Sequence, residues 1–446
     1  MMELKKYRLG KCLTFIENGA VIKQFKDGKG IPITRIETLS NNSFNRDKLG
    51  YANIFNLKEY AHYILDDKDL LMSHINSRSF LGRTVLYRKR LNEHIIHGMN
   101  LLRLKTNEHI LDPLYAYYFF QTKYFKKCID TIRKDAINQS SIAISDIKNI
   151  IIHIPDIERQ KHIVRVLQSL DQKIDINRQI NDNLEKMAKQ LYDYWFVQFD
   201  FPNEKGRPYK SSGGEMVWNE RLKREIPKNW KVKNIEDLAN VRKGTTITKS
   251  QTQKGSVKVV AAATSFSFLH NETNRSAYVI TVSSSGANAG YINFWREPIF
   301  ASDCSTVQGC SIEITLYCYY WLLHFQEKLF NQQIGAAQPH VYPEHISKIP
   351  IVIPPIPILN KVKNCMISIN MQQHIIEQEI EALSKQRDEL LPLLMNGQVS
   401  LNYHLSLSFA AISILYRYKP KNIEDEKNSY TDRCGRNVQC FIQRTA

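Results

Sequence analysis

Apolar residues recur at alternating spacings of four and three along two long stretches of the chain. The first seam runs from Ile163 to Trp195, and a second seam occupies the same positions 199 residues later, from Val362 to Leu394. A seam sustained over several heptads predicts a long helix that pairs in a coiled coil. The members that we expect to form this spacer are Ile163, Leu167, Leu170, Ile174, Leu184 and Leu191 in the first helix, and Val362, Met366, Ile369, Ile376, Ile380, Leu383 and Leu390 in the second.

A short apolar segment precedes each predicted helix. The stretches QSSIAISDIKNIIIHIPDI, from Gln139, and QPHVYPEHISKIPIVIPPI, from Gln338, share five isoleucine positions at the same offset. They also share Pro155 and Pro354, which suit a junction between a strand and a helix because proline tolerates a helix start. The chain therefore contains an internal repeat.

The regions before these segments also correspond. LLMSHINSRSFLGRTVLY and VITVSSSGANAGYINF both predict a strand, a polar loop and a second strand, while YAYYFF and YCYYWLL both begin aromatic helices. We therefore expect an α+β fold of two similar globular domains, each followed by a long helix. The helices could pair in either direction, and a pseudo-twofold relation between the two copies favours an antiparallel coiled coil. Polar seam positions at Asn177, Asn181, Gln373 and Arg387 would either fix its register or lie near solvent.

The repeat also sets the expected boundaries. Globular domains are expected at 1–155 and 230–354, and long helices at 156–199 and 355–398. The segment 200–229 is rich in Pro, Gly, Ser and charge, which is typical of a linker. Residues 399–446 form a tail that has no counterpart in the first copy.

Charge points to a polyanionic partner. The chain has 446 residues, with 61 Lys and Arg against 44 Asp and Glu, a formal net charge of +17. Such an excess favours nucleic acid ahead of an anionic membrane, although a merely basic cytosolic protein shows the same balance. The eight cysteines lack the spacing of a zinc site, so we expect no bound metal. With no signal peptide and no apolar run of ~20 residues, we expect a cytoplasmic protein.

Several longer stretches resemble the specificity subunit of type I restriction-modification systems. They are ERQKHIVRVLQSLDQKIDINRQINDNLEKMAKQLYDYWFVQFDFP, GRPYKSSGGEMV, EIPKNW and RDELLPLLMNGQ, and the likeness covers about Tyr7 to Val399. The second helix departs from the pattern, because PPIPILNKVKN lacks the charged start found at Glu158.

The resemblance implies two target-recognition domains that each read one half of a bipartite site in double-stranded DNA. It implies an antiparallel helical spacer that docks two modification (methyltransferase) subunits and directs N6-adenine methylation. Restriction (translocase and nuclease) subunits would add ATP-dependent cleavage. S-adenosylmethionine, ATP and Mg²⁺ are then expected on these partners, and no cofactor or catalytic residue on this chain.

Polar and basic loops supply the candidates for DNA contact, because Arg, Asn, Gln and Ser can reach base edges and Lys and Arg can reach phosphates. Loop side chains are solvated by default, so each of these assignments competes with a simple surface role. In the first domain the candidates are Asn76, Arg78, Arg83, Gln139 and Ser140; in the second they are Arg242, Lys243, Lys249, Ser284, Asn288, Gln338 and His340. The aromatic clusters after Tyr115 and Tyr317 could stack on bases, but their helical spacing favours core packing.

Two other function classes compete. DPLY at Asp112 looks like a degraded methyltransferase motif, but Asp112 and Pro113 suit a helix start equally well, and GANAG lacks the βαβ context of a cofactor loop. A non-DNA coiled-coil scaffold would require apolar loop tips, whereas these loops are polar and basic.

Overall fold

The computed structural model describes residues 3–26, 28–40, 43–136, 139–331 and 340–398, so the predicted tail lies outside the described residues. The chain divides into two compact units. Unit 1 joins the residues up to Ile176 with the segment that begins at Ile380, and unit 2 runs from Asn177 to Glu379. Among the described residues, none of the helices combines the length and the apolar character needed to cross a membrane.

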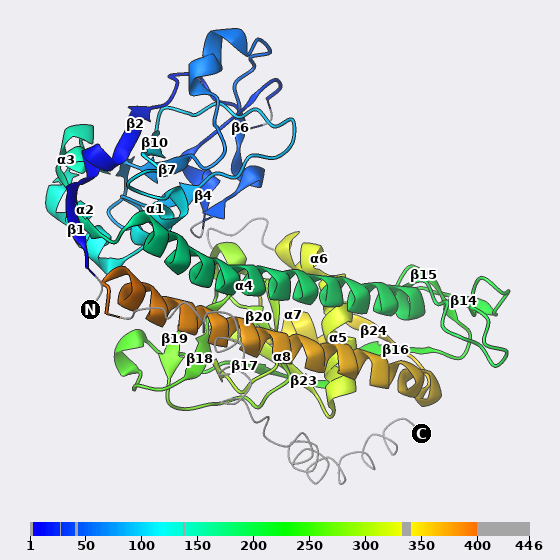
Figure 1. Ribbon diagram of the computed structural model, residues 1–446. Helices are drawn as coiled ribbons and strands as arrows, with labels where there is room; N and C mark the ends of the chain where they lie inside the picture. The colour runs from blue at the N-terminus through cyan, green and yellow to red at the C-terminus, as the bar shows by residue number, and fades with distance from the viewer. Residues whose placement is uncertain (1–2, 27, 41–42, 137–138, 332–339, 399–446) are drawn as a thin grey trace. The chain divides into compact units, whose positions relative to one another are not determined.

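Unit 1 contains a globular α+β domain built around a four-stranded sheet of order β2-β10-β7-β9 (Figure 1). Its strands are β1 (Lys5–Arg8), β2 (Leu13–Asn18), β3 (Pro32–Ile33), β4 (Leu39–Ser40), β5 (Ser43–Phe44), β6 (Gly50–Tyr51), β7 (Leu70–Ser73), β8 (Ile75–Asn76), β9 (Thr84–Leu86), β10 (Leu101–Thr106), β11 (Lys134–Asp135), β12 (Ser140–Ser141) and β13 (Ile151–Ile154). Its short helices are α1 (Pro113–Phe119), α2 (Lys123–Ile132) and α3 (Ile144–Asn149).

Unit 2 contains a second α+β domain whose main sheet has the order β17-β23-β20-β21. Its strands are β14 (Met216–Asn219), β15 (Arg224–Pro227), β16 (Lys231–Asn234), β17 (Ala239–Lys243), β18 (Val257–Val260), β19 (Phe266–His270), β20 (Val279–Ser283), β21 (Ile292–Trp295), β22 (Phe300–Ala301), β23 (Cys304–Gly309) and β24 (Pro350–Ile353). Its short helices are α5 (Ile312–Leu323), α6 (Gln326–Asn331) and α7 (Pro343–Ser347).

Strand pairing confirms the internal repeat. In unit 1, β1 pairs antiparallel with β13 and places Lys5 opposite Ile154; in unit 2, β16 pairs antiparallel with β24 and places Lys231 opposite Ile353. Ile154 and Ile353 are separated by the offset read from the sequence. The two four-stranded sheets also repeat their strand order, so the two domains share one framework.

The two long helices are α4 (Ile157–Tyr192), extended by a π-helical turn at Asp193–Val197, and α8 (Ile356–Met395). Each helix contributes one part to unit 1 and the other part to unit 2. In unit 1, Leu170 and Ile174, late in the first half of α4, pack with Leu383 near the end of α8. In unit 2, Gln373 of α8 donates a hydrogen bond to Glu185 of α4 at 2.9 Å, and residues of both helices belong to one apolar core. The antiparallel pairing predicted from the seams is therefore confirmed within each unit.

Most of the expected spacer residues lie in these seams. Ile163, Leu167, Leu170, Ile174, Leu184, Val362, Met366, Ile369 and Leu383 are buried. Leu191, Ile376, Ile380 and Leu390 are half-buried at the edges of the cores. Of the polar seam members, Arg387 forms an ion pair with Asp171 at 3.1 Å, and Gln373 donates a hydrogen bond to Glu185 at 2.9 Å. These two side chains have partners on the opposite helix.

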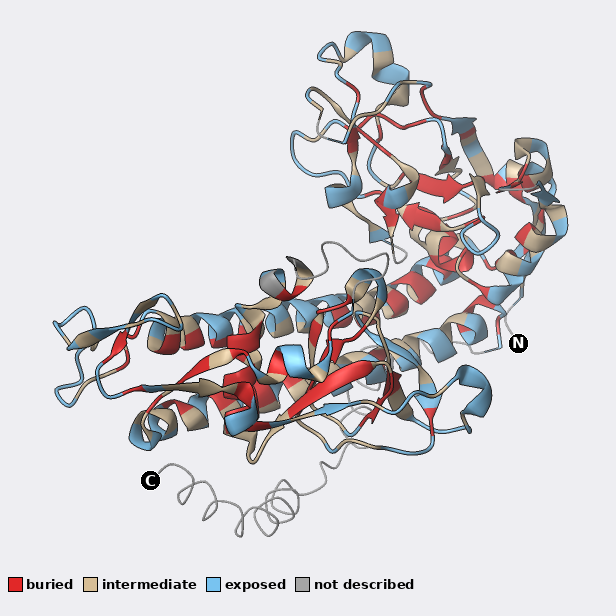
Figure 2. Cartoon of the chain, turned by 180° about the vertical axis from the view of Figure 1, so that it is seen from behind, coloured by how far each residue is buried: buried red, intermediate tan, exposed pale blue. Residues whose placement is uncertain are grey.

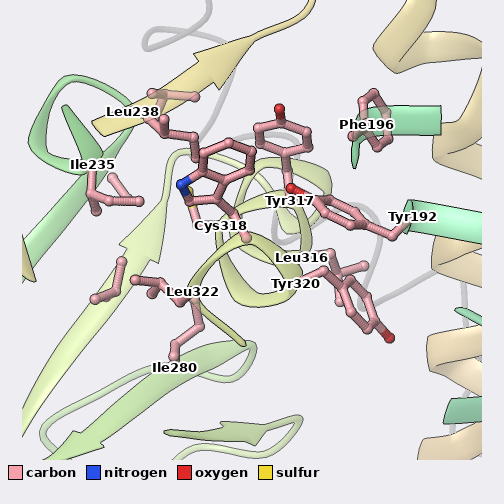
Figure 3. Packing of buried hydrophobic residues seen from close by; sticks show 14 of the residues in the cluster. Tyr192, Phe196, Ile235, Leu238, Ile280, Leu316, Tyr317, Cys318, Tyr320 and Leu322 are labelled. Carbon is pink, nitrogen blue, oxygen red and sulfur yellow. The ribbon is translucent and has the colours of Figure 1, made fainter. Parts of the chain in front are cut away.

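Apolar packing fills the interior of each unit, and buried residues concentrate on the sheets and on one side of each long helix (Figure 2). The core of unit 2 is aromatic: Tyr192, the last residue of α4, and Phe196 in the following π-turn meet Tyr317 of α5 (Figure 3). The centroid of the Phe196 ring lies 5.0 Å from that of Tyr317. This packing joins the globular domain of unit 2 to its part of α4.

The segment interpreted as a linker is folded. It forms the β14–β15 hairpin, in which Met216 lies opposite Pro227. Phe199, Phe201 and Trp230 flank or begin this segment and are buried, with the rings of Phe201 and Trp230 stacked at 5.0 Å. Burial of these aromatic anchors explains why a stretch rich in Gly, Ser and charge keeps a defined path.

Asp112 is a helix cap. Its Oδ1 accepts hydrogen bonds from the backbone N–H groups of Leu114 and Tyr115 at 2.9 and 3.0 Å, and Pro113 occupies the first turn of α1. A carboxylate that satisfies two free N–H groups at a helix N-terminus has a structural role. The DPLY stretch is thus accounted for by the fold.

Replacing Glu93 by glutamine is expected to destabilise unit 1 by roughly 1.5–3 kcal/mol, since bonds to a charged partner are lost. The Glu93 carboxylate accepts hydrogen bonds from Arg46 at 2.7 and 2.8 Å and from the Tyr87 hydroxyl at 2.9 Å. The Arg46 bonds in particular lower the pKa of Glu93 from 4.5 to about 2. Its stabilising contribution is therefore full above pH 4.5 and is lost as the pH falls toward 2.

Denaturant unfolding of wild type and Glu93→Gln across this pH range measures the effect. The stability difference between the two proteins should shrink as the pH falls below 4.5. A constant difference would contradict the assignment. Glu59→Gln, which changes a carboxylate on the exposed surface of the same domain, is the control and should leave stability nearly unchanged.

Candidate nucleic-acid interface

The first candidate surface is formed by loop 74–83, between β7 and β9, and the segment around β12. Strand β8 at the start of this loop pairs with β12, which places Asn76 opposite Ser140. Gln139 immediately precedes Ser140, and Arg78 follows Asn76 by two residues, so the antiparallel register places both at the same end of this strand pair. Both Arg78 and Gln139 are exposed. Residues that are distant in sequence thus meet on one surface.

Two of the candidate side chains, Asn76 and Ser140, form hydrogen bonds within this surface and stabilise the loop. The Asn76 side chain donates to Ser73 Oγ at 3.1 Å and accepts from the backbone N–H of Ser77 at 2.7 Å. Ser140 is buried and donates its hydroxyl to Asp135 at 2.6 Å. These bonds fix the loop conformation, so Arg78 and Gln139 are the side chains with the freedom to reach a ligand.

Two further basic side chains contact the same loop: Lys126, which the sequence did not single out, and the predicted candidate Arg83. Lys126 of α2 donates to the carbonyl oxygens of Arg78 and Leu81 at 3.3 and 3.2 Å. Arg83 stacks over the Phe80 ring with its guanidinium carbon 4.3 Å from the ring centroid, and burial lowers its pKa. The run of lysines on α2, from Lys123 to Lys127, was the available signal for this contribution.

A carboxylate lies within this basic surface. Arg133 forms an ion pair with Asp135 at 2.6 Å, and the bonds from Arg133 and Ser140 lower the pKa of Asp135. Arg133 also forms an ion pair with Asp130 at 2.6 Å, so its single positive charge is shared between two carboxylates, and Arg78 supplies a further positive charge near Asp135.

The second candidate surface is formed by loop 283–290, between β20 and β21. Its geometry repeats that of the first surface. The backbone N–H of Val341 donates to the carbonyl oxygen of Ser284 at 2.9 Å, and in unit 1 the backbone N–H of Ile142 donates to the carbonyl oxygen of His74 at 3.0 Å. Ser285 and His340 form an antiparallel bridge. His340 is therefore brought to this loop, while Gln338 lies outside the described residues.

The predicted DNA contacts in and beside loop 283–290 differ in how far their side chains are exposed. Ser284 is buried and Asn288 is half-buried, at the end of a 3-10 turn, Gly286–Asn288. His340 is exposed, with its ring stacked on Tyr342 at a centroid distance of 5.9 Å. Asn288 and His340 are the members that remain open to a ligand.

The exposed basic residues of β17 reach the same end of the sheet. Lys243 lies opposite Ser305 on β23, and Ser305 lies opposite Val282 on β20, just before loop 283–290. Arg242 and Lys249 are also exposed, and the Arg242 Nε donates to Asn240 Oδ1 at 3.0 Å. A basic edge strand and a polar loop therefore share one side of unit 2.

Arg275 is a further basic residue at this edge that sequence reasoning missed. It donates to Thr306 Oγ1 at 2.8 Å, to the Lys243 carbonyl at 2.7 Å and to the Asn274 carbonyl at 2.8 Å. All three acceptors are neutral oxygens, and burial lowers the pKa of Arg275. Its positive charge adds to those of the neighbouring residues. No local pattern in the sequence marks it, because its position depends on strand pairing.

The aromatic clusters belong to the core. Tyr118 and Phe119 of α1 and Tyr320 and Trp321 of α5 are buried. The Tyr118 hydroxyl donates to Asp171 at 2.6 Å. These rings are therefore placed for packing rather than for stacking on bases.

Each unit thus presents hydrogen-bonding and basic side chains at the same end of an equivalent sheet. Arginine, glutamine and asparagine are the side chains that discriminate base edges in the major groove, and lysine positions phosphates. Within the part of the chain that the structure describes, no group of three or more His, Cys, Asp or Glu is arranged to hold a metal ion. The geometry suits binding of a polyanion.

Comparison with known proteins agrees with this arrangement. A family model described as "Type I restriction modification DNA specificity domain" matches residues 1–186 and again residues 227–390. The putative type I restriction enzyme MjaX specificity subunit of Methanocaldococcus jannaschii is 28% identical over 406 residues, which covers 88% of this chain and 92% of that protein. The type I restriction enzyme EcoKI specificity subunit of Escherichia coli is 26% identical over 185 residues, or 41% of this chain and 39% of its own length.

A solved structure shares the fold. The crystal structure of a type I restriction-modification system S subunit from M. genitalium superposes with a TM-score of 0.55 at 16% sequence identity. The match covers 88% of this chain and 96% of that one. The repeated domain and long-helix architecture is therefore common to both.

Proposed function

Because the chain belongs to the type I restriction-modification DNA specificity family, we propose that it reads a two-part DNA site and directs N6-adenine methylation there by partner subunits. A specificity subunit recognises DNA and has no catalytic activity of its own. Family membership therefore sets aside the two alternatives, a methyltransferase and a non-DNA scaffold.

The observation that carries this proposal is the repetition of one framework with different loops. Both main sheets place their polar loop at the same end, held by equivalent bonds at Ile142 and Val341. The loops themselves differ, with Arg78 in one copy and Asn288 in the other. Two domains that share one framework but carry different loop side chains would recognise two different half-sites. Helices of fixed length between the readers would then hold the half-sites at a fixed gap.

An exposed apolar stripe supports the proposed docking of modification subunits. Ile180, Met187 and Tyr194 recur every seven residues along α4 and its π-turn, and all three are exposed. Apolar side chains at this spacing lie on one side of a helix, where a partner protein would bury them. S-adenosylmethionine would bind to these subunits, and ATP and Mg²⁺ would be used by added restriction subunits, in the cytoplasm.

Methylome sequencing tests the proposal. We expect cells that express this chain with its modification subunit to carry N6-methyladenine in a new split motif, with two specified halves around a fixed gap. Cells with the modification subunit alone, and cells with an unrelated specificity subunit, are the controls. If the new motif is continuous, or if no new motif appears although the complex assembles, the proposal is wrong.

A further inference from the structure

Arg296 connects the main sheet of unit 2 to helix α8. It follows the last residue of β21, and its side chain is only 8% exposed. Its Nη1 forms an ion pair with Glu377 Oε1 at 2.7 Å, and its Nη2 donates to Gln373 Oε1 at 2.7 Å. One guanidinium thus holds two side chains that lie one turn apart on α8.

The same contact continues to helix α4. The Gln373 amide, which is 1% exposed, donates to Glu185 Oε2 at 2.9 Å. The Tyr319 hydroxyl of α5 donates to the other oxygen of Glu185 at 3.4 Å. We name the four side chains of Arg296, Gln373, Glu377 and Glu185 the helix clamp. It joins the sheet to both long helices within unit 2.

The clamp and the candidate reading loop lie at opposite ends of one strand. Loop 283–290 leads into β21, and Arg296 follows β21. The strand pairs with β20 at four successive positions, from Val279 opposite Trp295 to Val282 opposite Ile292. At ~3.3 Å per residue such a strand spans roughly 13 Å, and its pairing in the sheet makes it a stiff connection. The orientation of the loop relative to the helices thus depends on where Arg296 is held.

The equivalent strand of unit 1 has no such contact in the described residues. After β9 comes Tyr87, whose hydroxyl donates to Glu93 inside the same globular domain. Unit 1 instead contacts its helices through Tyr118 of α1, which bonds to Asp171, the partner of Arg387. The clamp at the end of the strand is therefore a feature of the second copy.

We propose that Arg296 is a positioning residue that holds loop 283–290 at a fixed place on the helix pair and thereby narrows the range of accepted gaps between the two half-sites. The inference rests on the proposed function and adds a determinant of gap length outside the helices themselves. In the wild type the guanidinium carbon of Arg296 lies 5.4 Å from the centroid of the Phe294 ring. Methionine at this position would keep an apolar side chain over that ring but would lose the bonds to Gln373 and Glu377.

The test uses the purified complex of the full chain with its modification subunits. Duplexes carry the motif found by methylome sequencing with the native gap, or with a gap one base pair shorter or longer, and methyl transfer is measured on each. For Arg296→Met we expect the preference for the native gap to fall at least tenfold, with methylation of the native duplex retained. Arg296→Lys should show a smaller fall, because one ammonium can hold Glu377 or Gln373 but not both in this geometry.

Glu297→Gln is the matched control. Glu297 follows Arg296 directly and forms an ion pair with Lys258 of β18 at 2.6 Å. The substitution removes this ion pair and changes no contact of either long helix. Wild-type gap preference in Arg296→Met would overturn the inference, as would an equal loss of preference in Glu297→Gln. If Arg296→Met does not fold, unchanged preference in Arg296→Lys overturns it. Absence of any split motif with the wild-type chain refutes the proposed function instead, which separates the two failures.

Discussion

Replacing Phe196 by alanine is expected to destabilise unit 2 by about 3–5 kcal/mol, the usual cost of removing a buried aromatic ring. Phe196 is fully buried, and its ring lies 5.2 Å from that of Tyr192, 5.0 Å from that of Tyr317 and 6.1 Å from that of Trp230. Figure 3 shows Phe196, Tyr192 and Tyr317 where the end of α4 and the π-turn after it meet α5. The cavity would be lined by large rings that are themselves held in place, so little of it can collapse.

Calorimetry with denaturant titration measures this loss, because a transition belonging to unit 2 should move to lower temperature and lower denaturant. Tyr194→Ala is the matched control: it removes an aromatic ring two residues away that is 39% exposed, and we expect a change below about 1 kcal/mol. A Phe196→Ala protein within 1 kcal/mol of wild type would show that this cluster does not hold the recognition domain to α4.

Removing Arg78 and Gln139 together is expected to abolish most methylation of the complete motif and to relax its specificity in one half only. These two side chains are the exposed members of the first candidate surface, while Asn76 and Ser140 are engaged in holding the loop. Each lost base contact costs about 1–3 kcal/mol, so the double alanine variant should lose roughly a hundredfold or more in rate on the native motif.

Methylome sequencing of the variant with its modification subunit measures both effects. The half-site read by unit 2 should stay unchanged, whereas Asn288→Ala in loop 283–290 should relax only that half. Arg88→Ala is the matched control, because Arg88 is exposed in the same domain and forms an ion pair with Asp67 at 3.6 Å. Should Arg78 and Asn288 variants affect the same half, the assignment of one half-site to each unit would be wrong.

Regular spacing made the framework predictable from the sequence. The seam from Ile163 and its copy from Val362 locate the long helices. The same offset separates Ile154 from Ile353, and it therefore relates strand β13, which pairs with β1, to strand β24, which pairs with β16. These features follow from local periodicity and from repetition, which need no knowledge of tertiary contacts.

Features that depend on tertiary contacts were not predictable. The β14–β15 hairpin is stabilised by aromatic residues at its borders, although its own composition is typical of a linker. Ser140, a predicted DNA contact, is buried with its hydroxyl bonded to Asp135, and Arg275 reaches the basic edge only through strand pairing. Side-chain roles in loops are decided by partners that no spacing rule reveals.

The division of both long helices between the two units has a consequence for synthesis of the chain. Unit 1 needs the end of α8, because Leu394 and Met395 belong to its core and Asp171 bonds to Arg387, 216 residues further along. A ribosome synthesises the N-terminal domain before residues 177–379 of unit 2, and the α8 segment that completes this domain only after them. Contacts of such long sequence separation form slowly. Until the end of α8 is synthesised, the apolar side of α4 in unit 1 therefore stays exposed to solvent. A chain that terminated before Ile380 would lack the α8 residues that pack against this side.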